Sequence, residues 1–402
     1  MLFLGAVVAS AQDHEAHFEQ VDGLIYVDVA VNGSKPLPFL LDTGATGSLV
    51  SPAAARLAGL RGTESTVIGG PGSGGSSGEG SLGKSAGEIV HGVSLRVGGF
   101  EFPRQDVVVT SLGAVTAGTG HRTDGILSVA DLAVLEIDYG SSVIRFNETD
   151  RVPSEGGIPL RFENGFPLIE AEIGLPEGGR VTGTFLVDTG AKLAGLILTR
   201  SFLDRHAEIL RCGEHPRIPS IAAFGGTMAL EGGRIASLGL GQYSLAQPFT
   251  LFARDRSEVF DGQGIDGVIG TQLLSRFRFV MDFQHGKLML VGNATLEAPI
   301  LADASGLRIN VVPPDFHRFQ VIDVMAGSPA AEAGMRAGDA VEEIGGKAAE
   351  EMDLAEVRRM LSIPNRRYAL TVERGGDEMH IDLATRELFT FAACGVTPGA
   401  GR

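Results

Sequence analysis

The sequence lacks tryptophan, has only two cysteines and is short of positive charge. Its 402 residues include 33 Lys and Arg against 49 Asp and Glu, a formal net charge of −16 at pH 7. A nucleic-acid-binding protein needs a basic face for the phosphates, and anionic membranes attract basic segments, so this charge argues against both partners. Cys212 and Cys394 are too few for a disulfide framework or a zinc site, and we expect both to be unpaired.

Long hydrophobic runs are absent as well, so we expect no stable membrane insertion. Residues 1–12 are mostly apolar and contain Ala-Ser-Ala at 9–11, which is typical of an export cleavage site, although no basic residue precedes the run. We expect residues 1–17 to be an export-signal-like N-terminus and the protein to be periplasmic or secreted. A buried first strand or a frayed terminus is the alternative.

The chain is rich in glycine, with 57 residues, and 44% of it is hydrophobic. Glycine at about twice its usual 7% favours a β-rich protein with many turns over a helical bundle. The hydrophobic fraction is large enough for a sizeable core, and the length suggests two or three domains of roughly 150 residues each.

An internal repeat runs through most of the chain. Three short motifs occur twice in the same order, at offsets of 146, 142 and 144 residues: Phe-Leu-Leu-Asp-Thr-Gly-Ala (39–45) as Phe-Leu-Val-Asp-Thr-Gly-Ala (185–191), Asp-Gly-Ile-Leu (124–127) as Asp-Gly-Val-Ile (266–269), and Ile-Asp-Tyr (137–139) as Met-Asp-Phe (281–283). Their common order indicates a duplicated domain, with copies at residues 18–150 and 151–293.

Each copy is predicted to consist mostly of strands. In the first copy, residues 24–31 are predicted to form a strand, Asn32-Gly33 forms a turn, and residues 37–41 are a short apolar strand. A helix is predicted to begin at Ser51-Pro52, a capping residue followed by proline. The corresponding segments of the second copy are two strands at 167–173 and 181–187 and a helix near 200–210.

The repeated Asp-Thr-Gly motif carries the candidate chemistry. An apolar strand delivers Asp42 or Asp188 to a tight loop, where glycine lets backbone amides reach the carboxylate and the threonine hydroxyl can anchor the loop. Two such loops that meet on a pseudo-twofold axis would place Asp42 beside Asp188. The two acids would then share one proton, because neighbouring carboxylates do not both ionise easily. The ionised acid can take a proton from an attacking water, and the protonated acid can polarise a carbonyl and later protonate the amine.

On these motifs, residues 18–292 resemble the aspartic-protease superfamily, specifically bacterial retropepsin-like proteases, in a two-lobed layout similar to pepsin. The resemblance implies a mostly β fold with two retropepsin-like (acid protease) β-barrel lobes, and it makes Asp42 and Asp188 the catalytic pair. It implies no cofactor and no metal. It assigns the active-site loops to Thr43, Gly44, Ala45, Thr189, Gly190 and Ala191, and the supporting apolar-apolar-Gly strand to Ile126, Leu127, Val268, Ile269 and Gly270.

Two positions depart from this pattern. Ser128 stands where the first copy should have glycine, and we expect the packing to survive because serine is small. Lys192 follows the second Asp-Thr-Gly-Ala motif; it either points to solvent or lies near the acids, where it would favour their ionised form and shift activity to lower pH. For the flap that such proteases close over the substrate, the candidates are residues 69–87 and the turn at 224–226. Residues 69–87 could equally be a surface loop.

A third unit follows a linker at residues 294–305. Gly-Ser-Pro-Ala-Ala at 327–331 and Gly-Met-Arg-Ala-Gly-Asp at 334–339 resemble a bacterial PDZ domain, which implies an α+β domain at residues 306–386 before a tail at 387–402. By the same resemblance, Gly306, Leu307, Arg308 and Ile309 form the loop that captures a peptide C-terminus, and the next strand accepts the peptide by β-addition. A packing module that binds no peptide is the alternative.

These observations predict an exported, monomeric aspartic endopeptidase that acts on polypeptides at an active site within one chain. The PDZ domain would recruit peptides or regulate the enzyme. One rival is a catalytically inactive protein that uses the same lobes and PDZ domain only to bind peptides. A second rival is an enzyme whose lobes pair between two chains.

Overall fold

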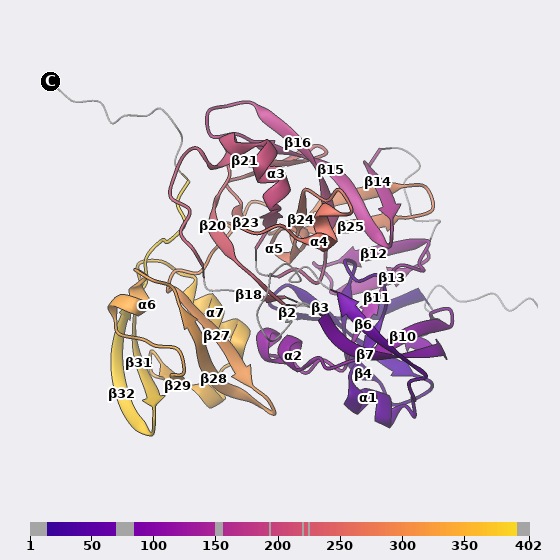
Figure 1. Ribbon diagram of the computed structural model, residues 1–402, viewed down its shortest axis with the longest axis horizontal. Helices are drawn as coiled ribbons and strands as arrows, with labels where there is room; N and C mark the ends of the chain where they lie inside the picture. The colour runs from indigo at the N-terminus through magenta and orange to yellow at the C-terminus, as the bar shows by residue number, and fades with distance from the viewer. Residues whose placement is uncertain are drawn as a thin grey trace, which may run out of the picture.

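The structure is a computed structural model that describes residues 14–69, 84–148, 156–192, 194–218, 221–223 and 226–391. Strands dominate these residues, and they form two β-rich lobes and a smaller α+β unit (Figure 1). Lobe 1 is indigo to purple in Figure 1, lobe 2 is magenta to orange, and the third unit, orange to yellow, lies beside them. Within the described residues, no helix has the length and apolar character needed to cross a membrane.

Lobe 1 is built on a ten-stranded sheet. Its elements are β2 (Glu19–Val21), β3 (Leu24–Val31), β4 (Leu37–Asp42), β5 (Leu49–Val50), β6 (Glu64–Gly69), β7 (Lys84–Val93), β8 (Leu95–Val97), β9 (Phe100–Glu101), β10 (Gln105–Val109) and β11 (Gly125–Ser128), with helices α1 (Pro52–Leu57) and α2 (Gly113–Thr119). The predicted strands at 24–31 and 37–41 are confirmed as β3 and β4. The predicted helix start is confirmed too, because the Ser51 hydroxyl accepts a hydrogen bond from the Ala54 amide at the first turn of α1.

Lobe 2 repeats this order of elements. It contains β14 (Ile158–Glu163), β15 (Phe166–Gly174), β16 (Arg180–Val187), β17 (Leu196–Leu198), β18 (Ile221–Ala223), β19 (Gly226–Met228), β20 (Leu230–Arg234), β21 (Ser237–Leu240), β22 (Tyr243–Ala246), β23 (Phe249–Ala253) and β24 (Gly267–Ile269), with α3 (Arg200–Arg205), the 3₁₀ helix η3 (Ala207–Leu210), α4 (Glu258–Asp261) and α5 (Thr271–Leu274). The parallel pair β4–β11 aligns Phe39 with Gly125, and its counterpart β16–β24 aligns Phe185 with Gly267. Equivalent residues therefore hold equivalent registers in the two lobes.

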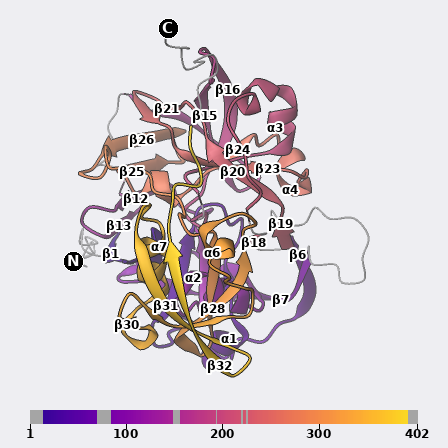
Figure 2. The ribbon, with the colours of Figure 1, turned by 90° about the vertical axis from the view of Figure 1, so that its left-hand side faces the viewer.

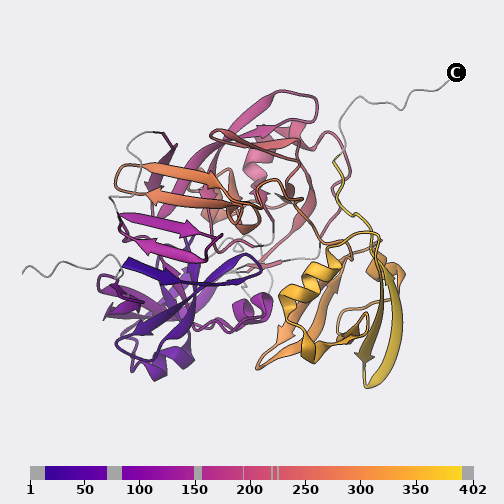
Figure 3. The same ribbon diagram turned by 180° about the vertical axis from the view of Figure 1, so that it is seen from behind.

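A sheet shared between the lobes marks the pseudo-twofold axis (Figure 3). It runs in the order β1 (Glu15–His17), β13 (Val143–Phe146), β12 (Val134–Asp138), β25 (Phe277–Asp282), β26 (Lys287–Gly292) and β14. At its centre the antiparallel strands β12 and β25 pair Glu136 with Val280, the residue 144 positions further along. This offset equals that of the third repeated motif, so Glu136 pairs with its own counterpart. Antiparallel pairing of equivalent residues places the symmetry axis at this point.

The third unit has its own apolar core and a five-stranded path of sheet that begins at β27. Its elements are β27 (Leu307–Val312), β28 (Asp315–Val324), α6 (Pro329–Glu332), β29 (Ala340–Ile344), β30 (Lys347–Ala348), the 3₁₀ helix η4 (Ala349–Glu351), α7 (Leu354–Leu361), β31 (Arg367–Arg374) and β32 (Asp377–Ala384). The amphipathic helix α7 packs against β27 and β28, and β31 pairs with β32 in the final hairpin. β27 lies at the edge of the sheet, beside α7.

Cys212 is disulfide-bonded, so the expectation of two unpaired cysteines is wrong; the other cysteine of the chain, Cys394, lies outside the described residues. The expected export-signal-like segment falls mostly on residues 1–13, which also lie outside the described residues.

Candidate active site

The two repeated aspartates lie against each other at the junction of the lobes. Each accepts a hydrogen bond from the glycine amide of its own loop, Gly44 to Asp42 Oδ1 at 2.8 Å and Gly190 to Asp188 Oδ1 at 2.7 Å. A side chain at Gly44 would lie 2.7 Å from the Asp188 carboxyl carbon, and one at Gly190 would lie 2.6 Å from that of Asp42. Glycine is therefore required twice, because each carboxyl group occupies the space beside the opposite glycine.

The two carboxyl groups also hydrogen bond to each other, and the pKa of each is raised above its ordinary value. Burial, followed by the negative charge of Asp188, raises the pKa of Asp42 well above its ordinary value. Burial raises the pKa of Asp188 as well, and hydrogen bonds from Gly190 and Asp42 oppose this rise. Two acids in contact lose their protons in two separate steps, so between those steps the pair holds one proton.

The threonines of the two loops lock the lobes together. The Thr43 hydroxyl donates to the Val187 carbonyl at 2.6 Å and accepts from the Thr189 amide at 3.0 Å. The Thr189 hydroxyl in turn donates to the Leu41 carbonyl at 2.9 Å and accepts from the Thr43 amide at 3.1 Å. Each threonine thus anchors the opposite loop, whereas the sequence suggested only that it anchors a loop.

The aspartates open into a cleft of about 970 Å³ with apolar walls from both lobes. Lobe 1 contributes Leu24, Leu40, Ile68, Val108, Val115 and Ile126, and lobe 2 contributes Phe166, Leu186, Ile197, Met228, Phe260 and Val268. The candidate support strands divide by alternation: Ile126 and Val268 line the cleft, whereas Leu127 and Ile269 pack into the main core. An extended apolar cleft around a pair of acids is suited to a polypeptide chain.

The position of Ser128 explains the departure from the glycine pattern. Its hydroxyl donates to the carbonyl of Ala45 in the active-site loop at 2.6 Å. At the equivalent Gly270 of lobe 2, a side chain would collide with the carbonyls of Ala191 and Ala194. There the Thr271 amide binds the Ala191 carbonyl instead, at 2.7 Å. The packing therefore survives in lobe 1, as expected, and the serine adds a hydrogen bond.

Lys192 does not point to solvent. Its ammonium group donates to the Gly118 carbonyl at 3.0 Å and lies 3.4 Å from the carboxylate of Asp22, and its side chain is only 10% exposed. Burial, aided by the nearby charge of Arg358, lowers the pKa of Lys192 to about 7. Its hydrogen bonds thus go to lobe 1, where they join the second active-site loop to α2.

The candidate peptide-capturing loop lies in the same cleft, but two of its amides are already engaged. Gly306, Leu307, Arg308 and Ile309 all line the cleft wall. The Gly306 amide donates to the buried carboxylate of Asp303 at 2.6 Å, and the Leu307 amide donates to the Ser305 hydroxyl at 3.0 Å. A peptide C-terminus would have to replace these internal partners.

The two flap candidates are described only in part. Residues 69–87 include the end of β6 and the start of β7, which pair antiparallel. The turn at 224–226 connects β18 to β19. Residues 70–83, 224 and 225 lie outside the described residues. Nothing in the sequence marked the third unit as a wall of the cleft, because that wall depends on how the domains pack.

Two family models match parts of the chain. Residues 27–130 match the family model described as aspartyl protease, and residues 320–374 match the model described as PDZ domain. The crystal structure of aspartic proteinase from Irpex lacteus is similar over 71% of this chain and 99% of that chain, with a TM-score of 0.41 and 14% identity. No curated protein matches the sequence. The chain thus contains an aspartyl protease domain and a PDZ domain.

Proposed function

We propose that this protein is an aspartic endopeptidase that hydrolyses polypeptides with a water held between Asp42 and Asp188. The observation that carries the proposal is the contact between two half-buried carboxyl groups that hydrogen bond to each other in an apolar cleft. A pair that holds one proton offers a base and an acid at the same place. The threonine hydrogen bonds between the two loops hold the two carboxyl groups in place.

In each of the two steps of the proposed reaction, one acid accepts a proton and the other donates one. The ionised carboxylate removes a proton from the water as its oxygen attacks the carbonyl carbon, and the protonated carboxyl donates its proton to the carbonyl oxygen. The tetrahedral product has two hydroxyl groups. Its collapse returns one hydroxyl proton to a carboxylate while the other acid protonates the amide nitrogen, and the carbon–nitrogen bond breaks. The pair is left with one proton, as before the reaction.

Two further features belong to the proposal. Both acids come from one chain, which supports a monomeric enzyme over lobes that pair between chains. The apolar N-terminal run supports export to the periplasm or out of the cell.

Incubation of the purified full chain with denatured casein from acid to neutral pH tests the activity. We expect cleavage that a statine-type transition-state analogue inhibits and that the Asp42→Asn and Asp188→Asn variants lose. Casein left intact at every pH would favour the rival, a protein that binds peptides without cleaving them. Full activity in either variant would exclude the shared pair of acids.

A further inference from the structure

Helix α2 of lobe 1 lies where a peptide would bind the PDZ domain. In peptide binding by strand addition, the ligand pairs with an exposed sheet edge. Here that edge is β27, with α7 beside it, and α2 packs against β27 (Figures 1 and 3). A side chain at Gly120, the residue that ends α2, would lie 2.6 Å from the Leu354 side chain of α7. Helix α2 and the residue that ends it therefore contact β27 and α7, the two elements that border the peptide-binding groove of the PDZ domain.

Arg358 of α7 fixes this contact from the PDZ side. Its guanidinium donates to the carbonyl of Ile309 on β27 and to the carbonyl of Gly118 in α2, both at 2.9 Å, and it lies 3.4 Å from Asp22. The Ile309 carbonyl is thus capped on the open edge of β27. A peptide added to this edge would compete with Arg358 for that carbonyl.

The same contact reaches the active-site loop of lobe 2. The Gly118 carbonyl and the Asp22 carboxylate each accept from two cations, Arg358 of the PDZ domain and Lys192 of lobe 2. All four residues line the cleft that holds the aspartates. The PDZ domain, α2 and the second active-site loop therefore meet at a single set of hydrogen bonds in the cleft wall. Figure 2 shows the PDZ domain in front of lobe 1.

Helix α2 has little tendency to form by itself. Its seven residues include two glycines and two threonines, it has no acidic residue in the first turn, and no side chain caps its N-terminus. Tertiary contacts must therefore hold its conformation. Such a segment can leave its site at a lower cost in free energy than a stable helix.

We propose that α2 is an internal ligand of the PDZ groove and that this docked state restricts access of long polypeptides to the catalytic cleft. This inference rests on the proposed peptidase function, because it names the regulation of that site. Release of α2 from β27 breaks the bonds of Arg358 to Gly118 and Asp22 and opens the PDZ end of the cleft. The amides of Gly306 and Leu307, which donate to Asp303 and Ser305, are not free to capture a peptide C-terminus in the docked state.

Arg358→Gln tests the docking, with Arg359→Gln as the matched control. Arg359 is exposed on the same helix, and no hydrogen bond or ion pair of its side chain is present among the described residues. Hydrogen exchange of the full chain is measured in an Asp42→Asn background that prevents self-cleavage. It should become at least tenfold faster in residues 113–119 and 307–312 of Arg358→Gln but not of Arg359→Gln. Asp22→Asn, which weakens the same contact from lobe 1 in a left-handed turn that asparagine tolerates, should act in the same direction.

Activity then tests the regulation. With Asp42 intact, Arg358→Gln should raise kcat/KM for denatured casein at least threefold and change that for a hexapeptide substrate less than twofold. Unchanged exchange in both docking variants would overturn the internal ligand, and faster exchange with unchanged casein cleavage would overturn the restriction. If no variant, including the wild type, cleaves casein, the proposed peptidase function fails, and the exchange result still decides whether α2 is docked through Arg358.

Discussion

The contact between Asp42 and Asp188 favours a state in which the pair holds a proton, because two neighbouring carboxylates repel each other. Burial and mutual repulsion raise the pKa of Asp42. For an acid whose pKa is higher in the folded than in the unfolded protein, the stabilisation is complete below the unfolded value, about 3.9, and is lost as the pH rises through the folded value. The dyad therefore destabilises the protein toward neutral pH, which is the opposite of an ordinary salt-bridged aspartate.

Asp42→Asn should remove this pH dependence. We expect its melting temperature, relative to that of the wild type, to rise between pH 4 and pH 7, because asparagine has no charge to bury. Peptide hydrolysis should fall at least about 100-fold, the usual contribution of a positioned acid or base. Asp28→Asn, at an exposed carboxylate of the same lobe, is the control for both measurements. A melting difference that is the same at both pH values would contradict the shared proton.

The role of the Thr43 hydroxyl between the lobes can be tested by substitution. Thr43→Ala removes two hydrogen bonds and leaves the Val187 carbonyl and the Thr189 amide without this partner in a buried site, so unfolding should become easier by roughly 2–4 kcal/mol. Thr43→Ser keeps the hydroxyl and should lose about 1 kcal/mol or less. Urea denaturation of both variants measures this, and equal stabilities would show that the hydroxyl does not join the lobes.

The duplicated strands explain why much of the site could be predicted. The register of β4 with β11 and of β16 with β24 follows from short apolar strands and from glycines that let Phe39 and Phe185 pack across Gly125 and Gly267. The sequence contains these signals. The partners of Thr43 and Thr189 could not be predicted, because a hydroxyl can anchor any loop within reach and only the packing of two lobes selects the opposite one.

Ser128 and Gly270 allow a test of the two loops at equivalent positions. Ser128→Gly should destabilise the protein by about 1–2 kcal/mol, because the Ala45 carbonyl loses its hydroxyl donor. Gly270→Ser should destabilise it by about 3 kcal/mol or more, because the new side chain meets the carbonyls of Ala191 and Ala194. Thermal unfolding compares them. If the serine at 270 is tolerated as well as the one at 128, the two loops are less rigid than their contacts indicate.

The way in which the domains pack against one another could not be predicted from the sequence. The motifs of the PDZ domain predict its own strands and helices, but no pattern in residues 113–120 or 354–361 indicates that these segments touch. Cys212 is a similar case, because two cysteines that are far apart in the sequence do not indicate that either forms a disulfide bond. Contacts between domains depend on surfaces that fold separately, and their complementarity cannot be deduced from local patterns.

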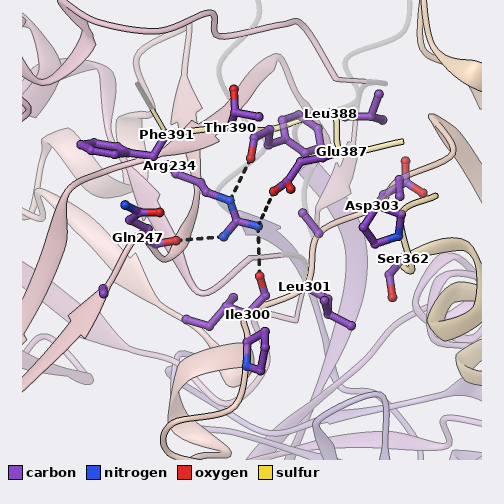
Figure 4. A pocket seen from close by; sticks show the side chains of 16 residues that line it. Arg234, Gln247, Ile300, Leu301, Asp303, Ser362, Glu387, Leu388, Thr390 and Phe391 are labelled. Atoms are coloured by element: carbon purple, nitrogen blue, oxygen red, sulfur yellow. Dashed lines mark hydrogen bonds and ion pairs between the residues drawn. The ribbon is translucent and has the colours of Figure 1, made fainter. Parts of the chain in front are cut away.

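Arg234 holds the PDZ domain at a second place, on lobe 2 (Figure 4). From β20, its guanidinium donates to the carbonyls of Gln247 and Phe389 at 2.8 Å and of Ile300 at 3.1 Å. Lobe 2, the linker before the PDZ domain and the segment after it therefore meet at one side chain. The buried Phe389 ring packs on Phe249, with ring centres 4.8 Å apart.

Arg234→Met should release this end of the PDZ domain, because it keeps the apolar stem but leaves three carbonyls without their donor. We expect hydrogen exchange of residues 294–305 to become at least tenfold faster, while the interlobe strands β12 and β25 exchange as before. Arg254→Met, which removes only the ion pair with Glu231 within lobe 2, is the control. Because the linker and α2 hold the same domain at two points, Arg234→Met should also speed exchange in residues 113–119, though less than Arg358→Gln does. Protection of the linker equal to that of the control would show that Phe389 packing alone fixes the domain.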